Sequence, residues 1–486
     1  MTYLSELLAT ACEELFNLTV EPVWTRPDEQ FGDYATNIAL QLAGKLERNP
    51  REIAEELKTY IENNSDYTIA RVQVAGPGFL NITLTDGVLW ENVTTAPQQI
   101  LKNQKVLLEY SCPNAFKELH TGHLYQTIIG DTLGRIFAAQ GADIYRANFG
   151  GDVGLHVAKC MWGIRDVLSG ELPEKLSDVP HEERAPWISQ AYVRGAKAYE
   201  EDEAAKTEIA EINQAIYGFH DSDDHESPLA QIYWTCREWS YDYFKDFYQN
   251  LSVAPFDKYY PESATTQSGL ALVRENIGPV FKESDGAVVF EGEEYGLHTR
   301  VFITSKGLPT YEAKDLGVIV SEVEDYQYDR RIILTGNDQS EYMKVVFAAL
   351  GQIDRELADK QTHIANGTIR FGDGKKMSSR LGNVTRAVEV LDTVSQAVRA
   401  DSDELRQQIS LGAVKYAFLK QRLGGDIAFD VEESVSLQGN SGPYLQYAHA
   451  RAQSILEKGT VRDISASAFQ PDERSLVRKL SEYTDV

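Results

Sequence analysis

The spacing of apolar positions changes along the chain between a strand period and a helical period. Residues 105–111 (KVLLEYS) form a short apolar run of strand character. Residues 124–141 then place apolar side chains at roughly helical spacing, and Gly141 supplies a stop. Between the two, residues 113–123 read PNAFKELHTGH. A polar cluster is therefore expected where a buried strand turns into a helix, which is where doubly wound α/β folds bind nucleotides.

The same alternation continues over residues 105–383. Strand-like runs (KVLLEYS, DIYRANF, RVFIT, RRIILTG and HIANGTIRF) alternate with helical ones, which predicts a Rossmann-like, doubly wound parallel sheet. Residues 158–250 are mostly charged and helical, and we interpret them as an insertion into this domain.

The two ends of the chain have patterns of their own. The start predicts a compact α/β unit, with a helix opened by Asn49 and Pro50 and a strand pair in ARVQVAGPGFLNITL. The segment GVLWENVTTAPQQILKNQ is expected to be a connector. Residues 386–486 have helical periodicity and few strand signals, which favours a bundle. The prediction is three domains, at 1–90, 105–385 and 386–486.

Length and composition agree with this division. A chain of 486 residues suggests about three domains of ~100–200 residues each. A hydrophobic content of 42% is that of an ordinary globular protein. No apolar run is long enough to cross a bilayer, and the start resembles an amphipathic helix rather than a signal peptide, so a cytoplasmic location is expected. The four cysteines are scattered without a CxxC pair, which predicts neither a zinc site nor a disulfide framework.

The net charge of −27 argues against a protein that coats nucleic acid indiscriminately. It leaves selective RNA binding open, because counterion release depends on local basic patches rather than on the total charge. Residues 370–386 (RFGDGKKMSSRLGNVTR) are such a patch.

The first motif with chemical meaning is HTGH. A helix N-terminus offers partial positive charge and free N–H groups to phosphate. His120 and His123 lie three apart, so both can project from the first turn toward triphosphate oxygens, and Gly122 lets a flat base approach the backbone. Two histidines in a loop are more often plain surface residues, but the position between a strand and a helix favours phosphate binding.

The second motif is GDGKKMSSRLGN, residues 372–383. Glycines, hydroxyls and cations in one short loop suit an arm that closes over phosphates, where a leaving pyrophosphate must be met by positioned cations. Alone, the segment is as readily a solvated basic loop. Together with HTGH upstream, phosphate chemistry is favoured.

These two motifs, separated by a long α/β domain, resemble the signatures of the class I aminoacyl-tRNA synthetases. More narrowly, SCPNAFKELHTGH is similar to the extended motif of the arginyl-tRNA synthetases. Residues 31–43 (FGDYATNIALQLA) and 76–84 (GPGFLNITL) resemble that family's N-terminal domain, which contacts the tRNA elbow. ANFGGDVGLH follows as the family expects, and residues 439–456 resemble the start of its helical anticodon-binding domain. The resemblance covers nearly the whole chain.

The resemblance implies an enzyme that charges tRNA(Arg) with L-arginine through an arginyl-adenylate made from ATP, with Mg²⁺ accompanying the nucleotide. A monomer is the usual state of the family, and no dedicated protein metal site is expected. The residues expected to act on the phosphates in catalysis are His120, His123, Lys117 and Lys376. Those expected to bind ATP are Gly122, His120, His123, Gly151, Asp152, Lys376, Met377, Ser378 and Ser379.

The chemistry of arginine gives a separate test. A planar guanidinium requires carboxylates and an aromatic or hydroxyl neighbour in a fixed fork. Glu262 is one candidate, and Tyr311 and Asp315 lie four apart, on one face if that segment is helical. Without the family pattern, Tyr311 and Asp315 are more readily an ordinary helix surface pair. The pattern further places Asn114 and Gln339 at the α-amino group and Ser111 and Cys112 near the carboxylate.

This sequence departs from the family pattern at two positions. The second signature has Ser379 where most class I enzymes have a lysine, and Lys117 of the first motif is expected to substitute for it. Cys112 stands where many relatives have a serine, so that contact is weaker or made by backbone.

Contacts with tRNA are expected from the N-terminal domain and from the helical region. The family pattern and the RNA preference for aromatic and arginine side chains select Phe31, Asp33, Tyr34, Asn37, Phe79, Asn81, Tyr444, Gln446, Tyr447 and Arg451. For Tyr444 and Tyr447, plain packing within the bundle is at least as good an interpretation.

Two other functions stay open. The family's bundle usually continues for several more helices, so residues 386–486 are expected to be an incomplete part of it, and a shortened, non-catalytic RNA-binding relative is one alternative. The other is an adenylate-forming ligase of the same fold with a different acceptor, for which the N-terminal domain would have no obvious use.

Overall fold

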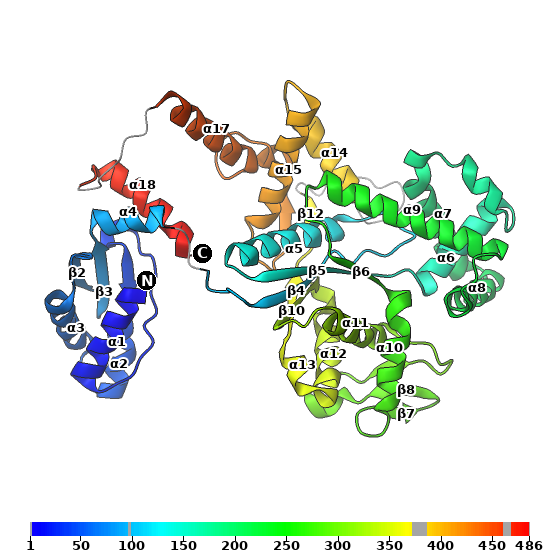
Figure 1. The fold of residues 1–486 in the computed structure, drawn as a ribbon, viewed down its shortest axis with the longest axis horizontal. Coiled ribbons are helices and arrows are strands. Elements are labelled where there is room, and N and C mark those ends of the chain that lie inside the picture. Colours follow the sequence, from blue (N-terminus) through cyan, green and yellow to red (C-terminus); the bar gives the residue numbers. More distant parts are fainter. Residues whose placement is uncertain (1, 96–98, 372–385, 460–467, 486) are drawn as a thin grey trace. The chain divides into compact units, whose positions relative to one another are not determined.

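The computed structural model describes residues 2–95, 99–371, 386–459 and 468–485 (Figure 1). It divides into two compact units, one formed by Met1–Gln98 with Gly459–Val486 and the other by Gln99–Lys458. The C-terminal residues therefore group with the N-terminal ones, a pairing that the apolar pattern did not indicate. Within the described residues, no helix is both long and apolar enough to span a bilayer.

The first unit packs helices on a small antiparallel sheet of order β1-β3-β2. Its α3 begins where the sequence predicts, because the Asn49 side chain accepts a hydrogen bond from the Arg51 N–H and Pro50 occupies the first turn. The segment expected to be a connector instead contains a helix, α4, whose Leu89 is fully buried. The elements are α1 (Thr2–Phe16), η1 (Glu29–Phe31), β1 (Tyr34–Thr36), α2 (Ile38–Leu46), α3 (Pro50–Asn64), β2 (Ile69–Ala75), β3 (Phe79–Leu84) and α4 (Asp86–Thr94).

Helix α18 (Pro471–Ser481), followed by η7 (Glu482–Asp485), completes this unit. Arg474 reaches Asp33 Oδ2 with Nη2 at 2.7 Å and Asp86 Oδ1 with Nε at 3.0 Å. Arg478 adds a hydrogen bond from Nη2 to the carbonyl oxygen of Pro27 at 2.5 Å. Val477 is buried in the same cluster as Leu4 and Tyr34. The two arginines thus hold a distant part of the chain against the N-terminal sheet.

The second unit is built on a five-stranded parallel sheet of order β11-β10-β4-β5-β6. Its strands are β4 (Lys105–Glu109), β5 (Asp143–Gly150), β6 (Lys258–Pro261), β10 (Arg330–Gly336) and β11 (Gln361–Asn366). Side chains of β4 from Val106 to Leu108 are buried, as a central strand covered on both faces requires. The predicted doubly wound sheet is confirmed.

Helices surround this sheet and form the expected insertion between β5 and β6. The insertion consists of α6 (Leu155–Leu168), η2 (Pro173–Asp178), η3 (His181–Glu183), α7 (Arg184–Glu201), α8 (Glu203–Ser222) and α9 (Pro228–Asn250). The remaining helices are α5 (Thr121–Ala139), α10 (Glu262–Glu275), η4 (Gly292–Tyr295), α11 (Tyr311–Asp325), η5 (Asn337–Gln339), α12 (Ser340–Ile353), α13 (Arg355–Asp359), α14 (Ala387–Ala397), α15 (Asp403–Leu419), α16 (Val431–Ser434) and α17 (Gly442–Lys458).

Two strand predictions need correction. RVFIT was expected in the parallel sheet, but β9 (Arg300–Ile303) lies in a separate antiparallel sheet with β7 (Lys282–Ser284) and β8 (Ala287–Phe290). HIANGTIRF forms two strands rather than one: β11, and then β12 (Ile369–Phe371), which pairs with β13 (Ile427–Phe429). Strand period alone does not reveal which sheet a strand joins, because that depends on partners distant in sequence.

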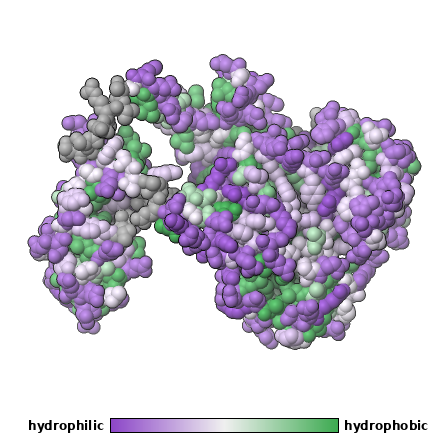
Figure 2. All heavy atoms as spheres, in the orientation of Figure 1, coloured by the Kyte–Doolittle hydropathy of each residue, from purple (hydrophilic) through white to green (hydrophobic). Residues whose placement is uncertain are grey.

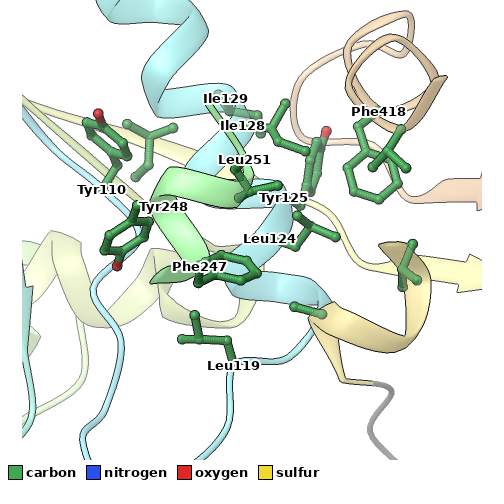
Figure 3. Packing of buried hydrophobic residues seen from close by; sticks show 14 of the residues in the cluster. Tyr110, Leu119, Leu124, Tyr125, Ile128, Ile129, Phe247, Tyr248, Leu251 and Phe418 are labelled. Atoms are coloured by element: carbon green, nitrogen blue, oxygen red, sulfur yellow. The ribbon is translucent and has the colours of Figure 1, made fainter. Parts of the chain in front are cut away.

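The largest core cluster surrounds α5, the helix that follows HTGH. Leu124, Ile128 and Ile129 of α5 pack against Phe247 and Leu251 at the end of α9 (Figure 3). On the other side Tyr125 meets Phe418 of α15 edge to face, with ring centroids 5.6 Å apart. Figure 2 shows mainly hydrophilic residues on the face drawn, in keeping with an interior that holds the apolar side chains.

Gly130 of α5 packs directly against Tyr110, the residue that follows β4, since a Cβ on Gly130 would overlap the Tyr110 ring. We expect Gly130→Ala to lower the free energy of unfolding by ~1–3 kcal/mol, because the buried ring has no space to move away. The measurement is urea unfolding followed by circular dichroism. The matched control is Gly218→Ala in α8, where a Cβ meets nothing within 4 Å and alanine should stabilise the helix. Equal effects in the two variants would contradict this packing.

Candidate active site

The site lies where the winding of the sheet reverses. Strand β4, the first strand of the parallel sheet in sequence, is central in that sheet, with β5 on one side and β10 on the other. Doubly wound sheets bind ligands at the carboxyl ends of the strands at such a reversal. The loop after β4 contains the first motif, β5 ends in Gly150, and α10 begins with Glu262 directly after β6.

The loop after β4 is held in an uncommon backbone conformation. Ser111, Cys112 and Phe116 have φ of 70°, 44° and 64°, the left-handed region that costs energy for residues other than glycine. Two buried contacts hold it there: the Ala115 N–H donates to the carbonyl oxygen of Gly151 at 2.8 Å, and the Phe116 N–H donates to Ser240 Oγ at 3.0 Å. Such strain in a loop at a strand end is typical of functional sites.

His120 and His123 form a reciprocal cap at the start of α5. Nδ1 of His120 accepts from the Gly122 N–H at 3.0 Å, and Nδ1 of His123 accepts from the His120 N–H at 3.2 Å. A backbone N–H can only donate, so the proton of each neutral ring is on Nε2. Desolvation and the nearby Lys117 lower the pKa of His120 to about 4, and desolvation and His120 hold the pKa of His123 well below its usual value. Both rings are therefore neutral N–H donors at physiological pH.

The charges around the two histidines suit an anion. Lys117 repels the protonated forms of His120, His123 and His156. Its own pKa is lowered, first by desolvation, and its Nζ lies 4.6 Å from the centroid of the Tyr192 ring. Desolvation and Lys117 lower the pKa of His156 to about 3. A phosphate would be attracted by Lys117 while accepting hydrogen bonds from the neutral rings.

Gly151 is the point at which three expected site residues meet. A Cβ on Gly151 would overlap Asn114 Oδ1, and it would lie 3.1 Å from His156 Cε1 and 3.2 Å from Glu262 Oε1. Any larger residue would therefore displace Asn114 or Glu262. The structure thus brings together Asn114, Gly151 and Glu262, which lie far apart in the sequence.

Glu262 has a cationic partner that sequence reasoning missed. Lys314 Nζ donates to Glu262 Oε2 at 2.6 Å, and both side chains are only 5% exposed. Burial raises the pKa of Glu262 although Lys314 opposes the shift. For Lys314, burial favours the neutral form, but the charge of Glu262 and the neighbouring Tyr217 together raise its pKa. The salt bridge with Lys314 uses Oε2 of Glu262, while Oε1 lies near Gly151.

Of the other arginine-binding candidates, Tyr311 and Asp315 lie in the first turns of α11, and Gln339 follows β10. Asp315 is buried and accepts a hydrogen bond from the Tyr342 hydroxyl. Tyr311, one turn before Asp315 in α11, is 58% exposed at the helix start, with Lys314 Nζ 5.4 Å from its ring centroid. Gln339 is exposed in η5, just beyond β10. Tyr311 and Asp315 are thus on a helix, as predicted, but Asp315 faces inward.

Three expected ligand-binding residues have internal roles in this conformation. Asp152 is fully buried, and its carboxylate accepts from Ser263 Oγ at 2.7 Å and Arg237 Nε at 2.8 Å. Ser111 is also fully buried, with Oγ 2.8 Å from the Tyr248 hydroxyl. Cys112 Sγ lies 3.7 Å from Glu109 Oε1, and burial holds the pKa of its thiol well above the usual value. These groups position the loop rather than line an open pocket.

The second motif lies outside the described residues, and with it Lys376, Met377, Ser378 and Ser379. Arg386, the first described residue after this segment, lies beside the first motif. It forms an isolated β-bridge with His120, its Nη1 is 3.1 Å from Glu118 Oε1, and the N–H of Ala387 donates to the carbonyl oxygen of Leu119 at 2.8 Å. One flank of the second motif is thereby anchored next to HTGH.

The expected tRNA contacts divide by exposure. Asp33, Tyr34 and Asn81 are buried, and Arg474 and Arg478 of α18 are both within ion-pair distance of Asp33. These three are packed inside the first unit in this conformation, and their contact with RNA stays a prediction. Phe31, Asn37 and Phe79 are exposed on the first unit, and Tyr444, Gln446, Tyr447 and Arg451 are exposed on α17. Gln446 also donates from Nε2 to the carbonyl oxygen of Gln408 at 3.0 Å.

His156, Lys314 and Tyr342 are the site residues that sequence reasoning missed. His156 follows GGDVGL closely enough for the motif itself to have suggested it, and Lys314 lies between two expected residues of one helix. Tyr342 carried no signal, because its contact with Asp315 links two helices.

Comparison with known proteins identifies the family of the chain. Residues 85–431 match the family model "tRNA synthetases class I (R), catalytic domain", and residues 2–84 match "Arginyl tRNA synthetase N terminal domain". The chain belongs to the arginyl-tRNA synthetase family. Among relatives of this family, an arginine–tRNA ligase of Fusobacterium nucleatum is 30% identical over 483 residues, 94% of this chain and 80% of the relative. One of Treponema pallidum is 28% identical, over 89% of this chain and 75% of the relative.

Solved structures of the arginyl-tRNA synthetase family have the same fold. The arginyl-tRNA synthetase of Thermus thermophilus aligns over 100% of this chain and 86% of its own, with a TM-score of 0.81 and 25% identity. That of Plasmodium falciparum covers the same shares with a TM-score of 0.79 at 19% identity, which supports the fold alone.

The buried carboxyl of Asp315 gives the site a pH-dependent stability. Desolvation raises its pKa from 3.8 to about 7, although the Tyr342 hydrogen bond opposes the shift. The folded state therefore holds this proton to higher pH than the unfolded state, and the stability it contributes is complete below the unfolded pKa and is lost as the pH rises toward 7. As the pH rises through this range, the free energy of unfolding of Asp315→Asn should increase relative to that of the wild type, by about 1.4 kcal/mol for each unit by which folding raises the pKa of Asp315.

Urea unfolding of both proteins at pH 5 and pH 8 measures the difference. Tyr342→Phe removes the hydroxyl that holds the pKa down, so its stability should still be falling at a higher pH than in the wild type. A difference between Asp315→Asn and the wild type that is the same at both pH values would exclude a titrating buried carboxyl.

Proposed function

We propose that the protein charges tRNA(Arg) with L-arginine in two steps at this site. The observation that carries the proposal is that one edge of the parallel sheet has two neutral histidine donors after β4 and a buried carboxylate after β6, with Asn114 and Gly151 between them. The histidines at the start of α5 face a position suited to phosphate, and Glu262 beside Gly151 and Asn114 suits a guanidinium.

In the first step an oxygen of the arginine carboxylate attacks the α-phosphorus of ATP. The bond from that phosphorus to the bridging oxygen breaks in line, and pyrophosphate leaves with the electron pair. We propose that the Nε2–H groups of His120 and His123 donate to phosphate oxygens, and that Lys117 and Lys376 offset the charge developing on the leaving group. Neutral histidines contribute donors whose protonation does not change near neutral pH.

In the second step a hydroxyl of the terminal ribose of the tRNA attacks the carbonyl carbon of the arginyl-adenylate. The new ester bond joins arginine to the RNA, and AMP leaves as its phosphate accepts the electron pair of the broken bond and the proton of the ribose hydroxyl. The reaction needs no protein nucleophile, so the site must chiefly position two substrates and keep water from the mixed anhydride.

We propose that the guanidinium of arginine lies between Glu262, Asp315 and Tyr311. Lys314 already occupies Glu262 Oε2, so the substrate would take Oε1, the oxygen near Gly151. Binding of a cation favours the ionised form of Asp315 and so lowers its raised pKa. Asn114 and Gln339 are proposed to hold the α-amino group. Ser111 and Cys112 would act on the arginine carboxylate through the shape of the loop that they form.

Mg²⁺ fits this proposal as a companion of the nucleotide. Among the residues that the structure describes, no three or more His, Cys, Asp or Glu side chains form a group that could hold a metal ion, and Mg²⁺ commonly binds through substrate phosphates and water. When bound, it would supply charge neutralisation on those phosphates. A monomer working in the cytoplasm is likewise proposed, on the pattern of the family.

Contacts with tRNA are proposed for the exposed candidates. On the first unit these are Phe31, Asn37 and Phe79, and on α17 they are Tyr444, Tyr447 and Arg451, whose Nη1 lies 3.3 Å from the Tyr447 hydroxyl. Exposed aromatic rings with a neighbouring guanidinium suit stacking on unpaired bases. A ligase with a different acceptor is less favoured, because residues 2–84 match the N-terminal domain of the arginyl enzymes.

Arginine-dependent exchange of pyrophosphate into ATP tests the first step directly. We expect exchange with arginine, enhanced by tRNA(Arg), and little or none with lysine or citrulline, because each leaves a buried carboxylate without its planar cationic partner. Citrulline is the sharper control, since it keeps the shape of arginine and loses its charge. Absence of exchange with arginine even in the presence of tRNA(Arg) would refute the proposed activity.

The capping and chemical roles of His120 can be separated by two substitutions. His120→Ala should cost ~1 kcal/mol of stability through loss of the cap and reduce the exchange rate by ~10²–10³ through loss of a phosphate donor. His120→Ser retains a side-chain cap but cannot reach the phosphates, so its melting temperature should stay near the wild type while the rate falls as far. Wild-type exchange in His120→Ser would rule out the chemical role.

A further inference from the structure

A cavity that the proposed reaction does not use lies between α9 and the edge strand β6. It has a volume of about 720 Å³, within the range of small-molecule sites. Its walls include four aromatic rings, of Tyr241, Tyr248, Phe256 and Tyr259, and the cations Arg237 and Lys245 line it as well. Proteins bind unstacked nucleotides by stacking aromatic rings on the base and placing basic side chains near the phosphate.

The rings form a connected wall. Phe256 lies 5.0 Å from Tyr248 and 5.5 Å from Tyr259 by ring centroids, and Tyr241 lies 6.3 Å from Tyr259. Tyr248 is 5% exposed and Tyr259 is 38% exposed, so the wall runs from the protein interior to the surface. A flat base can enter past Tyr259 and stack on rings that are already held by their neighbours.

The charge around the cavity differs from that of the chain. The chain has a net charge of −27, whereas the charged residues that line the cavity are Arg237 and Lys245 against Asp242. Arg237 is held in place by Asp152 at 2.8 Å and lies 4.8 Å from the centroid of the Tyr241 ring. Lys245 is exposed on α9. Because Asp152 and Asp242 offset the two cations, the local charge is close to neutral, and a phosphate attached to a base in the cavity would depend on the exposed ammonium of Lys245.

Two hydrogen-bonded connections lead from the cavity to the candidate active site. The Tyr248 hydroxyl lies 2.8 Å from Ser111 Oγ, and Thr127 Oγ1 is 2.8 Å from the same oxygen and 2.6 Å from the carbonyl oxygen of His123. Tyr248 belongs to the same core cluster as Tyr110, the residue before the strained loop (Figure 3). A shift of the Tyr248 ring would thus act on the loop and on the first turn of α5.

The other connection runs through Arg237. Its partner Asp152 accepts from the N–H of Ser263 at 2.9 Å and from Ser263 Oγ at 2.7 Å. Ser263 directly follows Glu262, and Asp152 directly follows Gly151. An occupant that moves Arg237 would consequently act on both sides of the proposed guanidinium site.

We propose that this aromatic cavity binds one unstacked nucleotide, with its base against the Tyr241–Phe256–Tyr259 wall and its phosphate toward Lys245. Occupation biases the loop after β4 through Tyr248 and the arginine site through Arg237 and Asp152. The nucleotide is supplied by an RNA strand or by a free mononucleotide, which share this chemistry. The inference rests on the proposed function only in taking tRNA(Arg) as the RNA.

The RNA source is tested by photo-cross-linking, which requires no turnover. Transcripts of tRNA(Arg) carrying 4-thiouridine or 8-azidoadenosine are irradiated with the full chain, and the modified peptides are mapped by mass spectrometry. We expect cross-links within residues 237–261. Tyr259→Ala and Lys245→Glu should reduce their yield, whereas Tyr295→Ala and Lys197→Glu, exposed residues of the same unit outside the cavity, should not.

The free-nucleotide source is tested by equilibrium dialysis of AMP and CMP. A stable sulfamoyl mimic of arginyl-adenylate first saturates the active site, so that any remaining binding is elsewhere. Tyr259→Ala is expected to weaken that binding on the order of tenfold, as for loss of one base stack. Binding of AMP or CMP in dialysis without a cross-link to tRNA assigns the cavity to a free nucleotide. A cross-link to tRNA without binding in dialysis assigns it to RNA.

The connection through Tyr248 has its own readout. Tyr248→Phe removes the hydroxyl beside Ser111 and keeps the ring, so nucleotide binding should persist while the stimulation of pyrophosphate exchange by tRNA falls. The proposal is overturned if neither arm detects a nucleotide at residues 237–261, or if Tyr259→Ala and Lys245→Glu leave binding unchanged. Failure of the proposed function would show instead as absent exchange in the wild type, with cross-linking unaffected.

Discussion

The site depends on the close approach of two backbones, that of the loop after β4 and that of the glycine pair ending β5. A Cβ on Gly150 would lie 2.6 Å from the carbonyl oxygen of Pro113, and one on Gly151 would overlap Asn114. The hydrogen bond from Ala115 to Gly151 fixes this contact. With the strand ends so close, the loop accepts three left-handed residues, and their strain is offset by the buried hydrogen bonds around them.

The balance of buried charge gives this geometry its chemical preference. Behind the strands, Arg331 bridges Glu109 and Glu322, and all three are nearly inaccessible. Asp315 and Glu262 add two further buried carboxyls to this group, but only one further buried cation, Lys314, is paired with them. Burial raises the pKa of both Glu322 and Asp315, so protons occupy part of this excess. A guanidinium would supply the missing cation, and its binding would release protons instead of requiring charge to be created.

Sequence reasoning was most successful where a local signal has a local cause. The Asn49 cap, the apolar run of β4 and the period of α5 depend on neighbours within a few residues, and each predicted element is present. It failed for α4, which was expected to be a connector, because that helix is stabilised by Leu89 in a shared core rather than by a strong period of its own. It failed for RVFIT because sheet membership depends on a partner strand.

Predicted side-chain roles likewise differ according to whether the contacts of the residue are local or distant in sequence. Asp33 belongs to a motif that indicated RNA contact, yet α18, more than four hundred residues later, covers it with Arg474 and Arg478. Nothing near Asp33 in sequence signals this pairing. His156 and Lys314 are the opposite case, since both lie within segments that were already selected, and only their orientation was unknown.

By itself the sequence determined the fold class, the family and the order of the two signatures, because these are carried by residue types at short, regular spacings. Only the tertiary structure decided which candidates meet at one strand edge, which carboxylate already has a cation, and where an aromatic cavity connects to the site. The physical reason is that close packing and buried charge depend on distances between residues far apart in the chain, and periodicity contains no information about those distances.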